Sequence, residues 1–332
     1  TPKPSSAASD VYKRQVGRKA LEDSTTSDNN TACGAFALRD NTTGTRNTAL
    51  GASALDGNTT GDDNTSVGAS ALLSNTTGTQ NTAVGAYALD AGNHSNCNAF
   101  GYQALSANTT GASNCAFGSH ALQLNTTAAS NSAFGHRALD ANTTGARNSA
   151  MGSGALGANT TASYNIAVGQ DALTANTTGN QNNAFGYYAL VSNTTASWNN
   201  AFGEQSLTSN TTGSDNTAFG HRTLQANTTG SYNTAVGANA LDAATTASNN
   251  TAVGRNSATA ITTGYNNTTM GMSSLSALTT GFANACFGYS AGGSISTGAN
   301  NICIGRNAGE SGSPSGTITT VSDRLVLGDN NI

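Results

Sequence analysis

Hydrophobic and polar positions follow one pattern along most of the chain, and that pattern has a period of seventeen residues. The unit Gly68 to Val84 reads GASALLSNTTGTQNTAV, or in general form G-x-x-A-L-x-x-N-T-T-G-x-x-N-T-A-[V/F]. Every interval between anchoring glycines is seventeen residues, except the sixteen from Gly85 to Gly101. A period this strict is typical of a repeat architecture. The anchoring glycines are Gly17, Gly34, Gly51, Gly68, Gly85, Gly101, Gly118, Gly135, Gly152, Gly169, Gly186, Gly203, Gly220, Gly237, Gly254, Gly271, Gly288 and Gly305.

The length of the unit predicts strands. Helical repeats need roughly 30 residues or more, and each unit carries glycines, threonines and asparagines that form helices poorly. Short apolar pieces bounded by Gly, Asn and Thr indicate strands joined by tight corners. We therefore expect an all-β, parallel β-solenoid (a β-roll) with one unit per coil and about 18 coils, a rod roughly 80–85 Å long at about 4.8 Å per coil.

Four columns of apolar residues are expected to form the core. They are the Val, Phe, Met, Ile or Leu before each anchoring glycine, the alanine two before it, and the Ala-Leu pair three and four after it, as in Val84, Leu89, Phe117 and Leu122. A large buried side chain contributes roughly 1.5–3 kcal/mol, whereas ordering a residue costs about 1–2 kcal/mol. Two large groups per coil leave a deficit, which burial against other copies of the chain would reduce. We therefore expect self-association, with a parallel homotrimer favoured over the alternative of a thin single-chain solenoid.

Two polar columns have predicted structural roles. The anchoring glycine never varies, which indicates a positive φ or a close backbone approach. The asparagine four residues before it, from Asn30 to Asn301, is interrupted only at Cys97. Stacked asparagines at a turn can bond the amides above and below and tolerate the left-handed region. We expect a structural ladder.

The Asn-Thr-Thr column also matches the Asn-x-Thr acceptor pattern for glycosylation. The same asparagine is replaced by Ala244, Ile261 and Leu278 toward the C-terminal end. Because a column that accepts Ile and Leu is partly buried, a structural role is favoured over a glycan.

Composition gives little sign of chemistry. Only 9% of residues are charged and the net charge is −4, so no basic surface for nucleic acid or an anionic membrane is expected. No apolar run approaches the roughly 20 residues of a membrane span. His94, His120, His136 and His221 have no recurring acid or thiol partner. We expect no enzyme activity, cofactor or metal.

The five cysteines lack zinc spacings. Cys286 and Cys303 are one period apart, and Cys97 and Cys115 nearly so, which suits a disulfide between neighbouring coils. Buried thiols in alanine-like positions are the favoured alternative.

The pattern divides the chain into three parts. Residues 1–15 lack the repeat, and their piece SSAASDVYKRQ resembles translated sequencing-adapter contamination. We therefore expect a foreign, disordered leader, with a flexible leader of the protein itself as the alternative. Residues 16–305 form the solenoid. In residues 306–332 an irregular loop with Pro314 precedes a last strand in RLVLGDNNI, which we expect to lead into a further C-terminal domain.

Function must then lie on the variable positions. These are the two residues after the anchoring glycine and a second pair before the Asn column, where aromatic and polar side chains gather. Such a surface can bind a cell-surface glycan or a protein receptor, although solvated corners are the commoner outcome. The candidate binding residues are Tyr102, His120, His136, Tyr187, Tyr188, Trp198, His221 and Arg222.

The run NTAVGAYALD, residues 81–90, resembles repeats of bacteriophage tail fibres, and Asn81 to Gly85 resembles in kind the Asn-Ser-Val-Ala-Ile-Gly motif in the heads of trimeric autotransporter adhesins. The resemblance covers residues 16–305. It implies a trimeric left-handed β-roll, attachment to a host or cell surface, and an extracellular location on a virion or cell surface. NNICIGRNAG and RLVLGDNNI resemble the segment that precedes a self-cleaving chaperone domain in such phage proteins.

Two other classes of function remain open. An ice-binding (antifreeze) solenoid would present stacked threonines, but Thr42 and Thr43 are adjacent and in a strand would point to opposite faces. A glycan-degrading enzyme would cluster carboxylates, whereas Asp56, Asp90, Asp140 and Asp242 share a column, with Asp40 one residue beyond it, and are scattered along the chain.

Overall fold

The computed structural model describes residues 14–311 and 316–328 and confirms the parallel β-solenoid. Its described elements are three-residue strands, one per coil. Within each of the two units given below, successive strands pair in parallel register, in most cases seventeen residues apart. The short coil keeps this pairing, since Thr82 pairs with Asn98. The chain divides after Ser163 into two compact units, which we describe separately.

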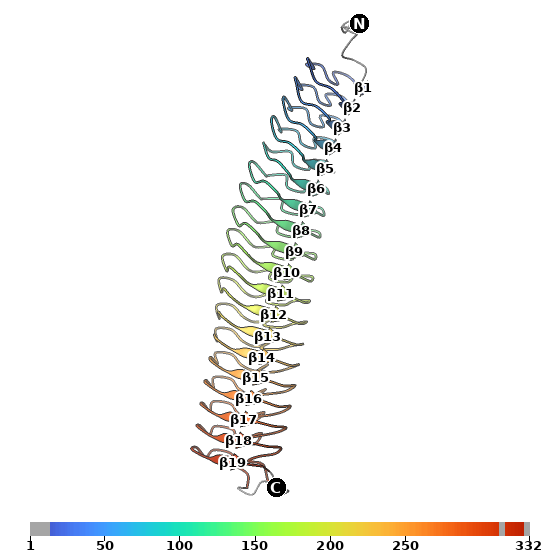
Figure 1. Ribbon diagram of the computed structural model, residues 1–332. Coiled ribbons are helices and arrows are strands. Elements are labelled where there is room, and N and C mark those ends of the chain that lie inside the picture. The colour runs from blue at the N-terminus through green and yellow to red at the C-terminus, as the bar shows by residue number, and fades with distance from the viewer. Residues whose placement is uncertain (1–13, 312–315, 329–332) are drawn as a thin grey trace. The chain divides into compact units, whose positions relative to one another are not determined.

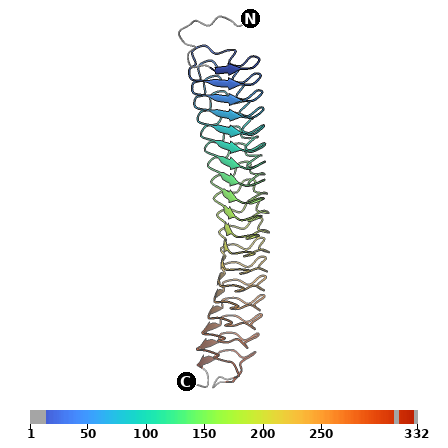
Figure 2. The same cartoon turned by 90° about the vertical axis from the view of Figure 1, so that its right-hand side faces the viewer.

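The first unit contains β1 to β9, and the second contains β10 to β19 (Figure 1). In Figure 2 the strands of the first unit, coloured blue to green, form parallel rungs of one sheet. The strands of the first unit are β1 Arg14–Val16, β2 Thr31–Cys33, β3 Thr48–Leu50, β4 Thr65–Val67, β5 Thr82–Val84, β6 Asn98–Phe100, β7 Cys115–Phe117, β8 Ser132–Phe134 and β9 Ser149–Met151. Those of the second are β10 Ile166–Val168, β11 Asn183–Phe185, β12 Asn200–Phe202, β13 Thr217–Phe219, β14 Thr234–Val236, β15 Thr251–Val253, β16 Thr268–Met270, β17 Ala285–Phe287, β18 Ile302–Ile304 and β19 Leu325–Leu327.

The core of each coil is small. The middle residue of a strand points inward, as Ala83 does, and the Ala-Leu pair after the glycine closes the interior, with Ala88 and Leu89 fully buried. Each core leucine adopts a left-handed backbone, for example φ 52° at Leu89. That conformation costs a non-glycine residue about 1–2 kcal/mol, which burial of the leucine side chain, worth about 1.5–3 kcal/mol, offsets.

The prediction that the residues before the anchoring glycines belong to the core is wrong. Residues before the anchoring glycine face outward, and Phe117 and Phe219 are 37% and 56% exposed. Successive side chains of a strand alternate between faces, so the inward alanine forces its large neighbour out. A coil with one leucine and two alanines inside has no room for a phenyl ring as well.

The anchoring glycines have both properties that the sequence predicted. Gly135 has φ +137°, and a Cβ built on it would lie 2.6 Å from the carbonyl oxygen of Gly152. A side chain at this position would therefore meet the backbone of the next coil. The glycine of Asn-Thr-Thr-Gly has no positive φ, consistent with its replacement by Ala128 and Ala162.

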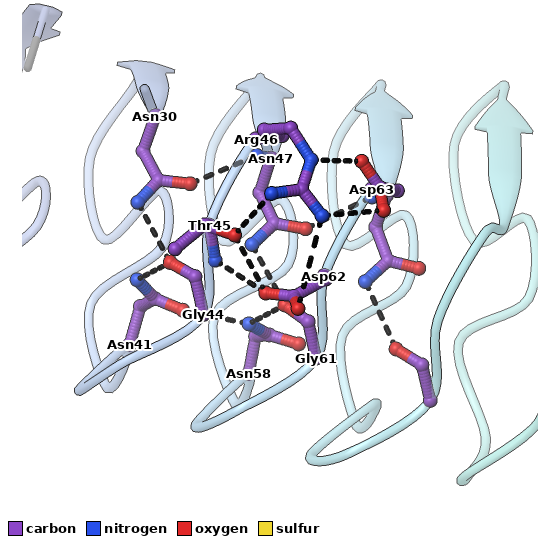
Figure 3. A network of polar contacts seen from close by, with 12 residues as sticks. Asn30, Asn41, Gly44, Thr45, Arg46, Asn47, Asn58, Gly61, Asp62 and Asp63 are labelled. Atoms are coloured by element: carbon purple, nitrogen blue, oxygen red, sulfur yellow. Dashed lines mark hydrogen bonds and ion pairs between the residues drawn. The ribbon is translucent and has the colours of Figure 1, made fainter. Parts of the chain in front are cut away.

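The predicted asparagine ladder is confirmed (Figure 3). The Asn47 N–H donates to Asn30 Oδ1 at 2.8 Å, and Asn47 Nδ2 donates to the carbonyl of Gly61 at 2.7 Å. The left-handed conformation that we assigned to the asparagine belongs to the residue before it, Arg46, with φ 58°. The ladder therefore satisfies buried backbone groups at the corner, while an exposed residue makes the turn.

A second ladder runs through the asparagine of Asn-Thr-Thr. Asn58 is fully buried, and its Nδ2 donates to Asn41 Oδ1 and to the carbonyl of Gly61, three residues on (Figure 3). A buried amide nitrogen that donates two hydrogen bonds is not available to carry a glycan in the folded coil.

The two ends of the described chain add detail to the predicted divisions. Arg14 and Gln15, which we assigned to the leader, form β1 with Val16 and pair with β2. β19 lies within the predicted last strand and pairs with β18 across a 23-residue interval. The rest of the leader, Pro314 and the last four residues lie outside the described residues.

Candidate functional site

The most continuous surface feature is the column of side chains immediately before each anchoring glycine and before Gly328, which we call the outer strip. All its members are apolar, in both units. They are Val16, Cys33, Leu50, Val67, Val84, Phe100, Phe117, Phe134 and Met151 in the first unit and Val168, Phe185, Phe202, Phe219, Val236, Val253, Met270, Phe287, Ile304 and Leu327 in the second.

Phenylalanines of the outer strip stack on one another. In the first unit the Phe117 ring lies 4.4 Å from that of Phe100 and 5.1 Å from that of Phe134, with planes only 8° apart. The second unit repeats the arrangement over Phe185, Phe202 and Phe219, at 4.7 and 5.5 Å. Stacking covers the ring faces but leaves the edges in solvent, so each unit presents a continuous apolar ridge.

The sequence contains a signal for this outward placement that our prediction missed. The inward column is almost always alanine, whereas the outer strip varies from Val67 to Phe100 and Met151 within one unit. Close-packed interiors respond to a difference of one methylene. A column that tolerates such differences in volume belongs on the surface.

A second feature is the glycine corner, which we define as the two residues after each anchoring glycine. In the first unit it brings together three predicted residues and Tyr87. The Tyr102 ring lies 6.2 Å from Tyr87 and 5.4 Å from His120, and His120 lies 6.3 Å from His136, all edge to face. The side chains alternate between the first and second corner position, which produces a zigzag column across four coils.

Two glutamines extend this column with amide groups. His120 Nδ1 lies 3.1 Å from Gln123 Oε1, and Gln123 Nε2 donates to Gln103 Oε1 at 3.2 Å. Tyr102 is 48% exposed, and His136 is exposed. The column therefore combines ring faces with hydrogen-bonding groups, a composition that suits a polar ligand with apolar faces.

In the second unit the glycine corners stack four other predicted residues. The pairs Tyr187–Tyr188, Glu204–Gln205 and His221–Arg222 lie on successive coils, because the Gln205 N–H donates to Tyr187 O and the Arg222 N–H donates to Glu204 O. Arg222 Nε also donates to Gln205 Oε1 at 3.0 Å.

The two tyrosine rings of this group are in contact, with centroids 4.0 Å apart. Their hydrogen bond raises the pKa of the Tyr187 phenol. Trp198, 55% exposed, belongs to a different corner, the one that precedes β12, so it is not part of this group.

The threonines of Asn-Thr-Thr form a third feature. The hydroxyl of the first threonine donates a hydrogen bond to the next coil, as Thr42 Oγ1 does to the carbonyl of Thr59 at 3.0 Å. The second threonine, which defines the threonine edge, is exposed, as in Thr43, Thr60 and Thr77. Both lie at a bend and not in a strand, so the inference that Thr42 and Thr43 point to opposite faces of a sheet is wrong.

The first coils also carry a charged network (Figure 3). Arg46 binds Asp63 of the next coil through Nε at 2.6 Å and Nη2 at 2.8 Å, and the Thr45 N–H donates to Asp62 Oδ1 at 2.6 Å. The hydrogen bond from Arg46 lowers the pKa of Asp63. Because the pair is exposed, it adds little stability, but it lines up neighbouring coils.

The sixteen-residue coil places a histidine in the interior. His94 takes the position of the usual glycine, and its carbonyl accepts from Asn81 Nδ2 at 2.8 Å, as a glycine carbonyl does elsewhere. Its Nε2 is buried without a partner, and so is Asn75 Oδ1 on the preceding coil, where the second ladder is interrupted. Burial lowers the pKa of His94 to about 4, so its imidazole is neutral at pH 7.

The described residues contain no group of three or more His, Cys, Asp or Glu side chains placed to hold a metal ion. Within the same ranges, no helix has the length and apolar character needed to span a membrane.

The two cysteine pairs differ in placement. Cys286 and Cys303 face each other in register inside the coil. Cys115 pairs instead with Asn98, and Cys97 lies inside a corner one residue earlier.

Comparison with known proteins does not add a family. No protein-family model matches the chain, and no curated protein matches it. The coarse description, a parallel β-solenoid repeat protein with coils of about seventeen residues, rests on the fold alone.

Proposed function

We propose that the chain is a non-enzymatic structural shaft, fibre-like or adhesin-like, that associates with copies of itself and attaches to a host or cell surface. The observation that carries this proposal is the outer strip. An apolar ridge that runs through every described coil of each unit is a larger feature than the scattered exposed apolar residues of ordinary soluble proteins.

The size of the ridge suits an interface between copies. Aromatic side chains have about 150–250 Å² of surface, so a half-exposed ring and its strand neighbour offer on the order of 100 Å² per coil. Seven coils of the outer strip carry a phenylalanine, and together with the smaller apolar side chains of the other coils they provide about the 800 Å² per partner of a standard interface. A second copy of this chain has the same coil spacing and can match the ridge coil for coil. The proposed assembly is a homotrimer.

The glycine corners are the proposed attachment surface. Their aromatic and amide groups, Tyr102, Gln103 and His120 in the first unit and Tyr187 and Gln205 in the second, lie on corners whose backbones are hydrogen-bonded from coil to coil. Ring faces and amides on a fixed spacing suit a glycan or a protein loop at a surface outside the cell. This placement supports an extracellular location on a virion or cell.

Light scattering of the full chain tests the assembly. The expected mass is about three times the 33.0 kDa of one chain. Phe117→Lys combined with Phe134→Lys is expected to shift the mass toward that of a monomer, because lysine at the ridge would bury a charge against the next copy. The control, Thr127→Lys with Thr144→Lys, changes the exposed threonine edge of the same coils by the same charge. A wild-type monomer at micromolar concentration would overturn the proposal.

Ice binding is a second candidate, and the threonine edge favours it more than the sequence suggested. Exposed threonines recur at the same corner of successive coils, beside threonines whose hydroxyls are fixed on the backbone. The control variant above tests it, because Thr127→Lys with Thr144→Lys would abolish thermal hysteresis if the edge binds ice. Hysteresis that this variant abolishes, with no self-association, would replace the shaft by an ice-binding protein.

A further inference from the structure

The last coils of the second unit have a core unlike the others. The inward strand position, alanine in most coils, holds Cys286 in β17 and Cys303 in β18, and the two pair directly in the parallel register. Both side chains are fully buried. Neighbouring strands lie about 4.8 Å apart, which is within the Cα separation of about 4.4–6.8 Å that a disulfide spans.

The leucine column changes in the same two coils. Gly292 and Gly309 stand where most coils have the core leucine, and they keep its left-handed backbone, with φ +63° and +82°. A Cβ on Gly292 would lie 2.7 Å from Cys286 Sγ, and one on Gly309 would lie 3.5 Å from Cys303 Sγ. Cysteine and glycine therefore replace alanine and leucine together. Beside Gly292 the Cys286 sulfur lies closest, whereas beside Gly309 the Ile318 side chain lies closest and the Cys303 sulfur is in ordinary contact.

We propose that Cys286 and Cys303 form a redox-active pair that a hydroperoxide converts to a disulfide, joining two adjacent coils covalently. Contact between the two thiols prepares them for the reaction. The Cys286 thiol donates a hydrogen bond to the Cys303 sulfur, which lowers the pKa of Cys303 and raises that of Cys286. Cys303 is therefore the sulfur that reacts first, since the thiolate is the nucleophile.

The reaction balances with hydrogen peroxide as the oxidant. The Cys303 thiolate attacks one peroxide oxygen, the O–O bond breaks, and a sulfenic acid forms on Cys303 while hydroxide leaves. Cys286 then attacks the Cys303 sulfur, displaces the second hydroxide, and gives up its proton. Two thiols lose two electrons and two protons, and one peroxide becomes two waters. Because both thiols are buried, the oxidant reaches them when the terminal coils open locally.

The chain supplies its own control pair. Cys97 and Cys115 also belong to neighbouring coils, but Cys97 points inward and its thiol donates to the carbonyl of Gly111 at 3.3 Å, whereas Cys115 lies on the first, outward position of β7. The two side chains are out of register, so no disulfide is expected between them.

Peroxide treatment of the folded, full-length chain tests the proposal. The background is Cys33→Ser, because Cys33 is exposed and would link two molecules. After treatment the remaining thiols are alkylated without reduction, and the digest is weighed. We expect the peptide that contains Cys286 and Cys303 to lose two hydrogens and resist alkylation, at a rate about tenfold above any loss at Cys97 and Cys115. Dithiothreitol should restore both thiols.

A second variant removes the pair while keeping a core that the chain uses elsewhere. Cys286→Ala combined with Gly292→Leu recreates the usual alanine and leucine, and should abolish the two-hydrogen loss while leaving a folded chain. Full alkylation of Cys286 and Cys303 after peroxide treatment of the wild-type pair would overturn the proposal. It would also be overturned if the folded chain and the urea-unfolded chain gave the same mixture of disulfides, because the fold would then not select this pair. The result is independent of the light-scattering test of assembly.

Discussion

The side-chain oxygen of Asn47 accepts a hydrogen bond from the backbone N–H of Asn64, at 2.9 Å, one coil further along. The same bond links Asn114 to Asn131 and Asn131 to Asn148, each at 2.9 Å. An N–H group that turns into the interior cannot reach water, so each asparagine supplies the acceptor that the next corner lacks.

Asn131→Ala should therefore destabilise the first unit by about 2–3 kcal/mol, because it leaves the buried N–H of Asn148 without its acceptor. The midpoint of urea unfolding measures the change. Asn125→Ala, in the second ladder, is the matched control and should cost about 1 kcal/mol.

The smaller cost at Asn125 follows from its neighbours. In Asn125→Ala the Ala128 carbonyl still accepts a hydrogen bond from Asn114 Nδ2, and Asn142 Nδ2 still donates one to the Gly145 carbonyl. Only Asn108 Oδ1 loses its donor, a state that Asn75 Oδ1 already has. Equal losses in the two variants would contradict the separate roles of the two ladders.

Cys97 is the one interruption of the first ladder, and it offers a stabilising change. Its thiol replaces the amide as donor to the Gly111 carbonyl, but it has no oxygen to accept from the Asn114 N–H. Cys97→Asn restores that acceptor and should raise the free energy of unfolding by about 1 kcal/mol. Cys97→Ser, which adds a hydroxyl too short to span the corner, should gain less. An unchanged urea midpoint in Cys97→Asn would show that the shortened coil does not follow the ladder geometry.

The period of the sequence was sufficient to predict the fold. A short unit that repeats strictly buries its apolar positions and pairs its strands when equivalent residues of successive units stack in register. It also located the anchoring glycines, the Asn30 ladder and the buried Leu89, whose columns do not vary in kind. The sequence did not predict which side chains of each strand point into the core and which point to solvent. Hydrophobicity alone places Phe117 inside, whereas the narrow cross-section of the coil decides that Ala116 is inside and Phe117 outside.

The candidate surface was predicted as a set of positions but not as a geometry. Tyr102, His120 and His136 form one column because the second corner residue, such as His120 with φ 60°, takes a left-handed backbone that directs it back toward its neighbours. Non-glycine residues seldom adopt that region, so sequence gives little indication of it. Trp198 is aromatic like Tyr102 but lies at the corner before β12, away from the glycine corners.

The two glycine columns should respond differently to alanine. Gly135→Ala places a side chain 2.6 Å from the Gly152 carbonyl oxygen at φ +137°, and should cost about 3 kcal/mol or more. Gly145→Ala should cost less than about 1 kcal/mol. A Cβ there also lies within 2.1 Å of the Ala162 carbonyl oxygen as the backbone stands, yet Ala128 and Ala162 occupy the same column, which shows that the corner adjusts. Urea midpoints of the two variants compare them directly, and similar costs would mean that positive φ is not the deciding factor.

His94 should make the stability of the first unit depend on pH. Its pKa is lowered by burial from 6.5 to about 4, and Nε2 has no partner that would hold a proton. Between these values the unfolded chain binds a proton that the folded chain does not, so the free energy of unfolding falls as the pH falls from 6.5 to 4. The full effect is about 3 kcal/mol.

The variant His94→Ala isolates this contribution, since alanine is accepted in the same column at Ala128. Burial raises the pKa of Asp90 on the same coil, which gives the opposite slope at lower pH, because the folded chain then holds the extra proton. The urea midpoint is therefore measured at pH 7 and pH 4.5 for both proteins. The fall in midpoint on acidification should be larger in the wild type than in His94→Ala. If wild type and His94→Ala lose equal stability on acidification, His94 is solvated in the folded chain and the short coil is open to water.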